Sequence, residues 1–229
     1  MSPLALRRQA DGSGPRRDGG GHGHARRRRT RSRRSALVAA AAAALLSLPV
    51  AVATAAPGSS APTPDSTHLL AAKRLDISMQ AQQMSNWCWA AAGNTISTYM
   101  GENYSQNTFC NAAFGRSQGS SCPNSQATLG HVQDALGWMG INPGSYVSGW
   151  LRYSTVQNEI NANRPVETRI QWSSGGGHMH VLYGYDTSRS WVYWGDPWPS
   201  NTRYNWASHG WYVDNYEFSW THSLYRIGA

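Results

Sequence analysis

The residue best suited to covalent chemistry in this 229-residue sequence is Cys88. The chain has three cysteines, and an odd number leaves at least one thiol without a partner in the same chain. Cys110 and Cys122 flank a loop rich in Gly, Ser and Asn that a disulfide would stabilise, whereas Cys88 lies in an apolar run. We therefore expect a Cys110–Cys122 disulfide and a free thiol at Cys88, which is nucleophilic as its thiolate.

The sequence around Cys88 predicts a buried helix, WCWAAAGNTISTYM, that begins near Asn86 or Trp87 and runs to Met100, with Ser85 or Asn86 as its cap. Cys88 would then lie in the first turn of the helix. There, unpaired N–H groups and the helix dipole stabilise an anion. A buried and unreactive cysteine is the alternative, and the position alone does not separate the two.

Two histidines, His178 and His180, follow three glycines in GGGHMHVLYGYD. Residues two apart on an extended strand point to the same face, so one histidine could be a general base and the other its neighbour. Ordinary strand residues and a zinc-binding pair are the alternatives. No second pair of close ligands is apparent in the sequence, so we expect no metal.

An acidic residue, Asp196, ends the next predicted strand after a turn at DTSRS. Antiparallel pairing would return it to the start of the His178 strand. A carboxylate at that point would accept a hydrogen bond from the imidazole Nδ1–H and direct Nε2 toward the thiol. Asp before Pro is also a common turn residue, which is the structural alternative.

One ordered set of residues carries a family resemblance. It consists of Gln82…Cys88-Trp89-Ala90, Gly177-His178-x-x-Val181-x-x-Gly184-Tyr185 and a later Asp196. This set, within roughly residues 75–229, resembles the papain-like cysteine peptidases. It is especially similar to the bacterial branch of staphopain-like and avirulence-effector proteases, in which the third residue is Asp rather than Asn.

The resemblance implies a role for each residue of the set. Cys88 would be the nucleophile, His178 the base and Asp196 the group that orients the base, with no cofactor. His178 is favoured over His180 because it precedes Gly184 by six residues. The family also places a glutamine some six residues before the nucleophile, where its amide and the cysteine N–H form the oxyanion hole. Gln82 fits this spacing better than Gln83, and Gln80 is too far away.

The elements that must position these residues predict an α+β fold, with helices first and strands later. Residues 101–124 are predicted to be loop-rich. Ser125 precedes a helical pattern that Gly140 can end, and Ser154 with Gln157 predicts a capped helix over 155–163. Four strands are predicted next: VETRIQW, HMHVLYGYD, SWVYWGD and WYVDNYEFSW. The resemblance implies the papain-like two-lobed fold, with an N-terminal helical lobe and a C-terminal antiparallel sheet lobe.

The first 56 residues have the order of a secretory signal: an Arg-rich region, an apolar run and small residues at its end. A transmembrane anchor is the alternative, but an Ala-rich run inserts weakly. We assign 57–74 to a linker or short pro-segment and 75–229 to the peptidase domain. The net charge of +8 belongs to residues 1–34, and the rest of the chain is near neutral, so the charge does not indicate nucleic-acid binding.

We therefore predict a secreted, monomeric cysteine endopeptidase that acts on protein or peptide substrates. It would have no nucleic-acid partner and no membrane contact after signal cleavage. Two alternatives stay open. A Cys-His-Asp amidase or transglutaminase acting on cell-wall peptides or glutamine side chains would have the same chain order. A non-catalytic module could instead use some of the 11 tryptophans to bind sugars.

Overall fold

The computed structural model describes residues 71–229. The predicted signal at 1–56 and most of the predicted linker at 57–74 lie outside the described residues. The last residues of that linker, however, form strand β1 (Ala72–Arg74), which pairs antiparallel with β4. The ordered domain therefore begins before residue 75. Within 71–229, no helix combines the length and the apolar character needed to cross a membrane.

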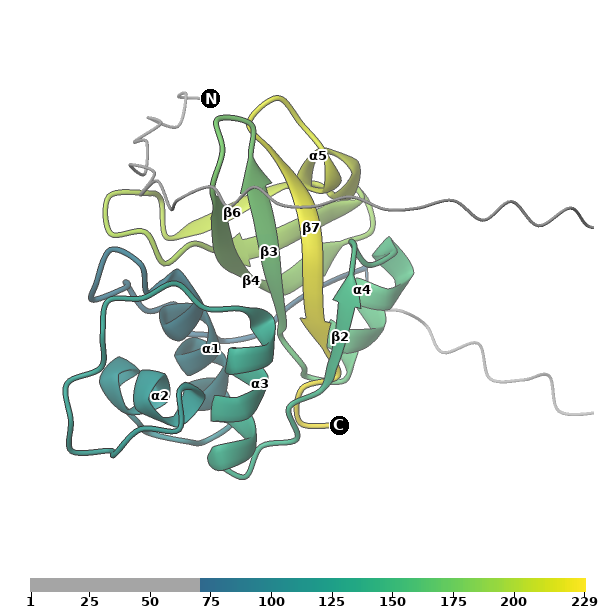
Figure 1. The fold of residues 1–229 in the computed structure, drawn as a ribbon. Coiled ribbons are helices and arrows are strands. Elements are labelled where there is room, and N and C mark those ends of the chain that lie inside the picture. Colours follow the sequence, from purple (N-terminus) through teal and green to yellow (C-terminus); the bar gives the residue numbers. More distant parts are fainter. Residues whose placement is uncertain (1–70) are drawn as a thin grey trace, which may run out of the picture. The chain divides into compact units, whose positions relative to one another are not determined.

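Three helices follow β1 and lie together beside the sheet (Figure 1): α1 (Cys88–Tyr99), α2 (Gln106–Ala113) and α3 (Leu129–Trp138). The predicted helix at Cys88 is confirmed, although its N-cap residue is Trp87 rather than Ser85 or Asn86. Residues 89–97 of α1 are buried, because its small side chains allow neighbouring elements to approach closely. At Gly93 an added Cβ would overlap the ring of Phe109 from α2.

Helix α2 corrects the prediction that residues 101–124 are loop. Ser105 caps it by accepting a hydrogen bond from the Thr108 N–H at 3.0 Å, and Phe109 buries it against α1. The sequence of this helix is polar, with few apolar residues to mark a helical period, so its Ser105 cap and the buried Phe109 stabilise it. The predicted Cys110–Cys122 disulfide is present and ties α2 to the following loop.

Two other helix boundaries differ from the predictions. The helical pattern predicted after Ser125 becomes a helix only from Leu129, with Thr128 as its N-cap residue and His131 as the partner of Thr128 in a capping box. Helix α4 (Tyr153–Asn161) starts two residues before the predicted 155–163, with Arg152 as its N-cap residue, so Ser154 lies inside it. Both differences are shifts of a helix start by a few residues.

The second half of the domain forms an antiparallel sheet in the order β2-β7-β3-β4-β5-β6, with β1 added to β4. Its remaining strands are β2 (Ser145–Ser148), β3 (Val166–Trp172), β4 (Gly177–Asp186), β5 (Trp191–Gly195), β6 (Tyr204–Ser208) and β7 (Phe218–Tyr225). The three predicted strands at 166–172, 178–186 and 190–196 are confirmed. The α+β architecture, with helices first and an antiparallel sheet later, is confirmed as well.

The predicted strand at 211–220 is wrong over its first half. There the chain forms the short helix α5 (His209–Val213), and β7 begins only at Phe218. The Ser208 hydroxyl accepts a hydrogen bond from the Trp211 N–H at 3.3 Å, so a cap overrides the β propensity of the aromatic residues. Strands β2 and β6 were not predicted. Both are edge strands with alternating exposure.

The segment between β1 and α1 joins the helices to the sheet. Tyr204 of β6 binds it twice, because its hydroxyl accepts from the Met79 N–H and donates to the Ile77 carbonyl, each at 3.1 Å. Met79 also lies against Gly195 at the end of β5, where an added Cβ would be 2.6 Å from the Met79 sulfur. The absence of a side chain at Gly195 therefore lets this segment, and with it the start of α1, lie beside Asp196.

Candidate active site

Cys88 is the first residue of α1 and is partly buried. Of the three cysteines, all of which lie in the described range, it is the free one, as predicted. The first N–H groups of a helix have no intrahelical acceptor, so an anion at this point is stabilised by unpaired donors and the helix dipole. Helix α1 packs on β4, the strand that carries His178.

His178 is placed by a tight hairpin between β3 and β4. The Trp172 N–H donates to the Gly176 carbonyl and the Gly175 N–H donates to the Trp172 carbonyl, both at 3.0 Å. Gly175 and Gly176 have φ angles of 94° and 80°, a region that residues with a side chain rarely adopt. The glycine run thus forms the turn and delivers His178, 4% exposed, to the second position of β4.

His178 and Asp196 form a buried pair, with Nε2 of the imidazole 2.7 Å from Oδ1 of the carboxylate. This corrects our assignment of the ring nitrogens, because we expected Asp196 at Nδ1 and the thiol at Nε2. With Nε2 bound to Asp196, Nδ1 is the nitrogen left for Cys88. The expected assignment followed the arrangement of the serine-protease triad, in which the carboxylate binds Nδ1.

The pKa of His178 is shifted by its interactions with both Asp196 and Cys88. Burial alone would lower it, but the charge of Asp196 and its hydrogen bond, followed by a hydrogen bond and a charge interaction with Cys88, raise the pKa of His178 to about 10. The imidazolium form is therefore the resting form at neutral pH. A cation beside Cys88 favours the thiolate, which is the nucleophilic form of cysteine.

The carboxylate of Asp196 is held on both oxygens. Oδ1 also accepts the Trp198 N–H at 2.8 Å, and Oδ2 accepts the Asn201 side-chain amide at 2.9 Å. The Arg203 guanidinium donates to the Asp196 backbone carbonyl and fixes the loop. Burial raises the pKa of Asp196, but the histidines outweigh this effect and hold it well below its usual range. The sequence analysis missed Asn201, and its place in a DPWPSN turn was the available signal.

Two tryptophans that the sequence analysis did not single out contact the His178 ring. Trp172 stacks on it, with ring centroids 6.0 Å apart and planes inclined by 24°. Trp198 meets it edge-on at 6.3 Å and 78°. An imidazolium over an indole face gains a cation–π attraction in addition to the contact area. These rings fix the plane of the imidazole and shield its bond to Asp196.

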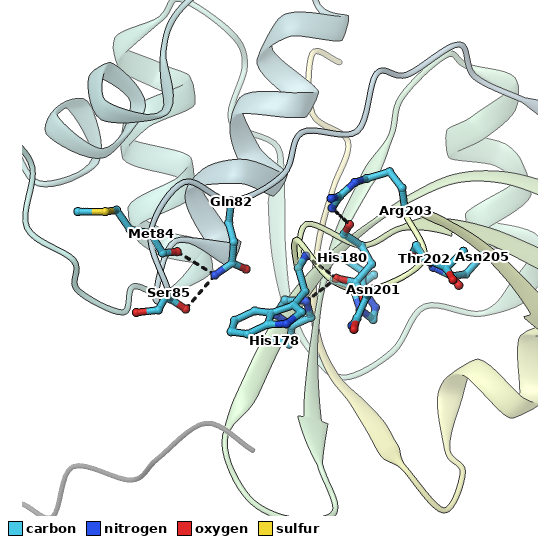
Figure 2. Close-up of polar contacts among 12 residues, drawn as sticks. Gln82, Met84, Ser85, His178, His180, Asn201, Thr202, Arg203 and Asn205 are labelled. Carbon is cyan, nitrogen blue, oxygen red and sulfur yellow. Dashed lines mark hydrogen bonds and ion pairs between the residues drawn. The ribbon is translucent and has the colours of Figure 1, made fainter. Parts of the chain in front are cut away.

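Gln82 is buried, at 5% exposed, and its backbone N–H donates to the Pro197 carbonyl at 2.8 Å, next to Asp196. Its amide nitrogen donates to the carbonyls of Met84 and Ser85, both at 2.8 Å (Figure 2). Its Oε1 has no hydrogen-bond partner within residues 71–229. Gln82 thus lies beside the pair, as the spacing implied, but both of its donors are engaged with backbone. Gln83 is exposed.

His180 lies two residues after His178 on β4, on the same face of the sheet, and is 2% exposed. One ligating atom from each of His178, His180 and Asp196 lies within 4.8 Å of the others. Two ligands of a tetrahedral zinc ion stand about 3.3 Å apart, whereas Nε2 of His178 and Oδ1 of Asp196 are 2.7 Å apart. His178 and Asp196 are therefore arranged as a hydrogen-bonded pair, with His180 3.6 Å from the second carboxylate oxygen.

A second buried acid, Glu167 of β3, was not singled out from the sequence. Its side chain is fully buried, and neither carboxyl oxygen finds a hydrogen-bond partner in the described part of the chain. Burial, and after it the charge of Cys88, raises the pKa of Glu167 well above its usual range. The group is thus held as a neutral acid near the thiol. The sequence predicted a strand here but not that Glu167 would be buried in it.

Comparisons with known proteins add a family and a set of distant folds. Residues 71–217 match the family of the papain-like cysteine protease AvrRpt2. Among solved structures, the peptidase domain of Streptococcus ComA, a bifunctional ABC transporter, is 17% identical with a TM-score of 0.49. The match covers 65% of this chain and 96% of that domain.

Two further structures are similar at a lower level. A double-glycine-motif protease from an AMS/PCAT transporter, solved with a leader peptide, is 15% identical over 69% of this chain and 95% of its own, with a TM-score of 0.43. Xylellain, a cysteine protease from Xylella fastidiosa, is 10% identical over 68% of this chain and 85% of its own, with a TM-score of 0.42. Curated protein sequences give no significant match. Because the family match spans more than half of the chain, this protein belongs to the papain-like cysteine proteases of the AvrRpt2 family.

Proposed function

We propose that this protein is a secreted cysteine endopeptidase that hydrolyses peptide bonds through Cys88, His178 and Asp196. The observation that carries the proposal is the buried 2.7 Å contact between His178 and Asp196, joined to a free thiol at the start of α1. A base with one nitrogen held by a carboxylate and the other free for a thiol is the arrangement that thiol acyl transfer needs.

In the proposed reaction, the Cys88 thiolate attacks the carbonyl carbon of the scissile peptide bond. The negative charge that forms on the carbonyl oxygen is stabilised by the Cys88 backbone N–H and by the Gln82 amide once it turns from its backbone partners. The imidazolium of His178 gives its Nδ1 proton to the leaving amine as the C–N bond breaks. Neutral His178 then takes a proton from water, which hydrolyses the thioester and restores the thiolate.

Secretion is supported by two features. The sequence of residues 1–56 has the order of a cleaved signal. The Cys110–Cys122 disulfide fits an oxidising compartment. Amino-terminal sequencing of the protein recovered from culture medium tests this, with a start after residue 53 to 56 expected. Recovery of the protein in the membrane fraction with residues 36–49 intact would instead indicate an anchor.

The catalytic proposal is tested by the purified mature protein with an epoxysuccinyl thiol inhibitor. We expect stoichiometric loss of activity on a diverse peptide mixture, and peptide mapping should find the label on Cys88 alone. The inhibitor-treated protein is the matched control for peptide cleavage. Labelling of Cys88 without any peptide cleavage, but with ammonia release from glutamine or cell-wall peptides, would instead establish an amidase or transglutaminase. Sugar binding that survives labelling, with no turnover of any substrate, would establish a binding module.

A further inference from the structure

A line of buried polar groups runs from Asp196 through His180 and Tyr212 to Thr168. Nε2 of His180 lies 3.6 Å from Oδ2 of Asp196. Its other nitrogen, Nδ1, lies 3.1 Å from the Tyr212 hydroxyl, and that hydroxyl lies 2.7 Å from Oγ1 of Thr168. All four residues are 3% exposed or less. Water is therefore excluded from the line, and its members must satisfy one another.

The cross-strand register brings this line together. Thr168 lies directly opposite His180 in the β3–β4 pair, so the two side chains share one face of the sheet. Tyr212 comes from α5, the helix that replaced part of a predicted strand. Rings on several sides, from Trp194, Tyr212 and Phe218, contact the His180 ring. His180 therefore has little freedom to rotate.

The two possible neutral forms of His180 are not equivalent in this setting. With the proton on Nδ1, the ring would donate to the Tyr212 oxygen and turn the lone pair of Nε2 toward the Asp196 carboxylate. Two buried acceptors would then face each other at 3.6 Å, which is unfavourable where water cannot intervene. With the proton on Nε2, an N–H points at the carboxylate and Nδ1 accepts from Tyr212.

When His180 is protonated on Nε2, all hydrogen bonds of the line point in the same direction, from Thr168 toward Asp196. Tyr212 donates to His180 and in turn accepts the hydroxyl proton of Thr168. Burial, above all, raises the pKa of Tyr212, so its hydroxyl remains a donor. Burial likewise lowers the pKa of His180, which keeps the ring neutral beside the charged His178. Among the described residues, Nε2 of His180 has no hydrogen-bond partner. Its N–H therefore acts on the Asp196 carboxylate as a fixed dipole.

We propose that His180 is a positioning residue whose Nε2–H tautomer, set by Tyr212 and Thr168, fixes the Asp196 carboxylate against His178. The inference rests on the proposed function, since it assumes that His178 and Asp196 are the catalytic pair. Asn201 donates to Oδ2 from the loop side, and His180 approaches the same oxygen from the sheet side. Together they prevent the carboxylate from turning and breaking its bond to His178.

Nitrogen chemical shifts of the histidines test the tautomer directly. A long-range proton–nitrogen correlation spectrum of the 15N-labelled protein between pH 5 and 8 should show His180 neutral throughout, with a protonated Nε2 and an unprotonated Nδ1. Tyr212→Phe should convert part of His180 to the other form. A wild-type His180 protonated on Nδ1, or on both nitrogens at pH 7, would overturn the proposal. This measurement needs no substrate, so it fails independently of the proposed peptidase activity.

Two substitutions with different reach test the consequence for catalysis. In His180→Gln the amide nitrogen can reach the position of Nε2, whereas in His180→Asn it reaches only that of Nδ1. We expect kcat to fall about 3-fold or less in His180→Gln but about 30-fold in His180→Asn, with KM nearly unchanged in both. Equal losses in the two folded variants, as a packing role would give, would contradict the proposal.

Discussion

The two sides of the active site differ in how their polar atoms are satisfied. On the sheet, the hydrogen bonds of the His178–Asp196 pair are complete: each carboxylate oxygen has a donor, and the imidazole contacts two indole rings. Before α1, Gln82 is in the opposite state, with its donors bound to backbone carbonyls and its Oε1 buried without a partner among the described residues. The catalytic base is thus oriented before substrate binds, whereas the Gln82 amide must turn before it can donate to a substrate oxygen.

This difference has an energetic meaning. A buried acceptor without a hydrogen bond costs about 1–3 kcal/mol, and the Gln82 side chain carries such an acceptor next to the loop at 83–86. Turning the amide toward a substrate oxygen breaks two hydrogen bonds, so part of the stabilisation of the transition state is offset. The hydrogen bond between His178 and Asp196 is already formed, so the base carries no such cost. We therefore expect substitutions on the sheet side to have the larger effects on turnover.

The largest effect is expected from His178→Ala. The thiolate loses its cation and the leaving amine loses its proton donor, so kcat/KM should fall about 10³-fold or more. Steady-state cleavage of a fluorogenic peptide measures the loss, and the rate of Cys88 alkylation at pH 7 should fall with it. An alkylation rate equal to that of the wild type would show that His178 does not activate the thiol.

A smaller loss is expected from Asp196→Asn, about 10²-fold in kcat/KM. The amide replaces an acceptor that receives three donors, so the imidazole loses both its charge partner and its orientation. His178 is also the source of a change with pH. Its pKa of about 10 in the folded protein should fall toward its ordinary value of about 6.5, so the alkaline limit of activity should move to lower pH.

The same shift has a consequence for stability. A histidine whose folded pKa lies above its unfolded pKa stabilises the protein fully below the unfolded value, and this contribution is lost as the pH rises through about 10. Thermal unfolding from pH 6 to 10 should therefore show the wild type losing stability over this window, and Asp196→Asn losing less. Parallel curves for the two proteins would contradict the pairing of His178 with Asp196.

Gln82→Ala tests the other side of the comparison. Removal of a preformed oxyanion donor typically costs 10²–10³-fold in kcat, but a donor that must first leave two carbonyls should cost about 10-fold. Gln83→Ala is the matched control, since Gln83 is exposed, and it should leave kcat unchanged. A loss of about 10³-fold in Gln82→Ala would show that the amide is already directed at the substrate.

What the sequence predicted follows from local rules. The cysteine count, the helical period after Trp87 and the β-prone segments at 166–172 and 178–186 can each be taken directly from the sequence, and all four agree with the structure. The order and spacing of the predicted strands then placed His178 beside Asp196, as the structure has them. These are the features for which a residue's own type and its near neighbours suffice.

What the sequence did not predict depends on contacts between distant segments. The choice of Nε2 over Nδ1 for Asp196 depends on how the His178 ring lies relative to the loop after β5, which comes from a different strand. Glu167 is buried because β3 lies between β4 and β7, which no pattern in VETRIQW indicates. Tyr212 reached the site because Ser208 caps a helix where a strand was expected.

The smallest effect on turnover is expected from removing the disulfide, because it lies on the helical side and away from the base. Closing a loop with a sequence separation of 12 stabilises the protein by about 3 kcal/mol on the chain-entropy model. Cys110→Ala/Cys122→Ala should therefore unfold at lower urea concentration, while kcat below the transition stays within about 2-fold of the wild type. Cys110 is fully buried beside α1, so the double variant keeps small apolar side chains there. If kcat instead falls about 10-fold in the folded double variant, the helices contribute more to the geometry of Cys88 than their contacts with the sheet indicate. The comparison between a preformed base and an oxyanion donor that is not preformed would then be incomplete.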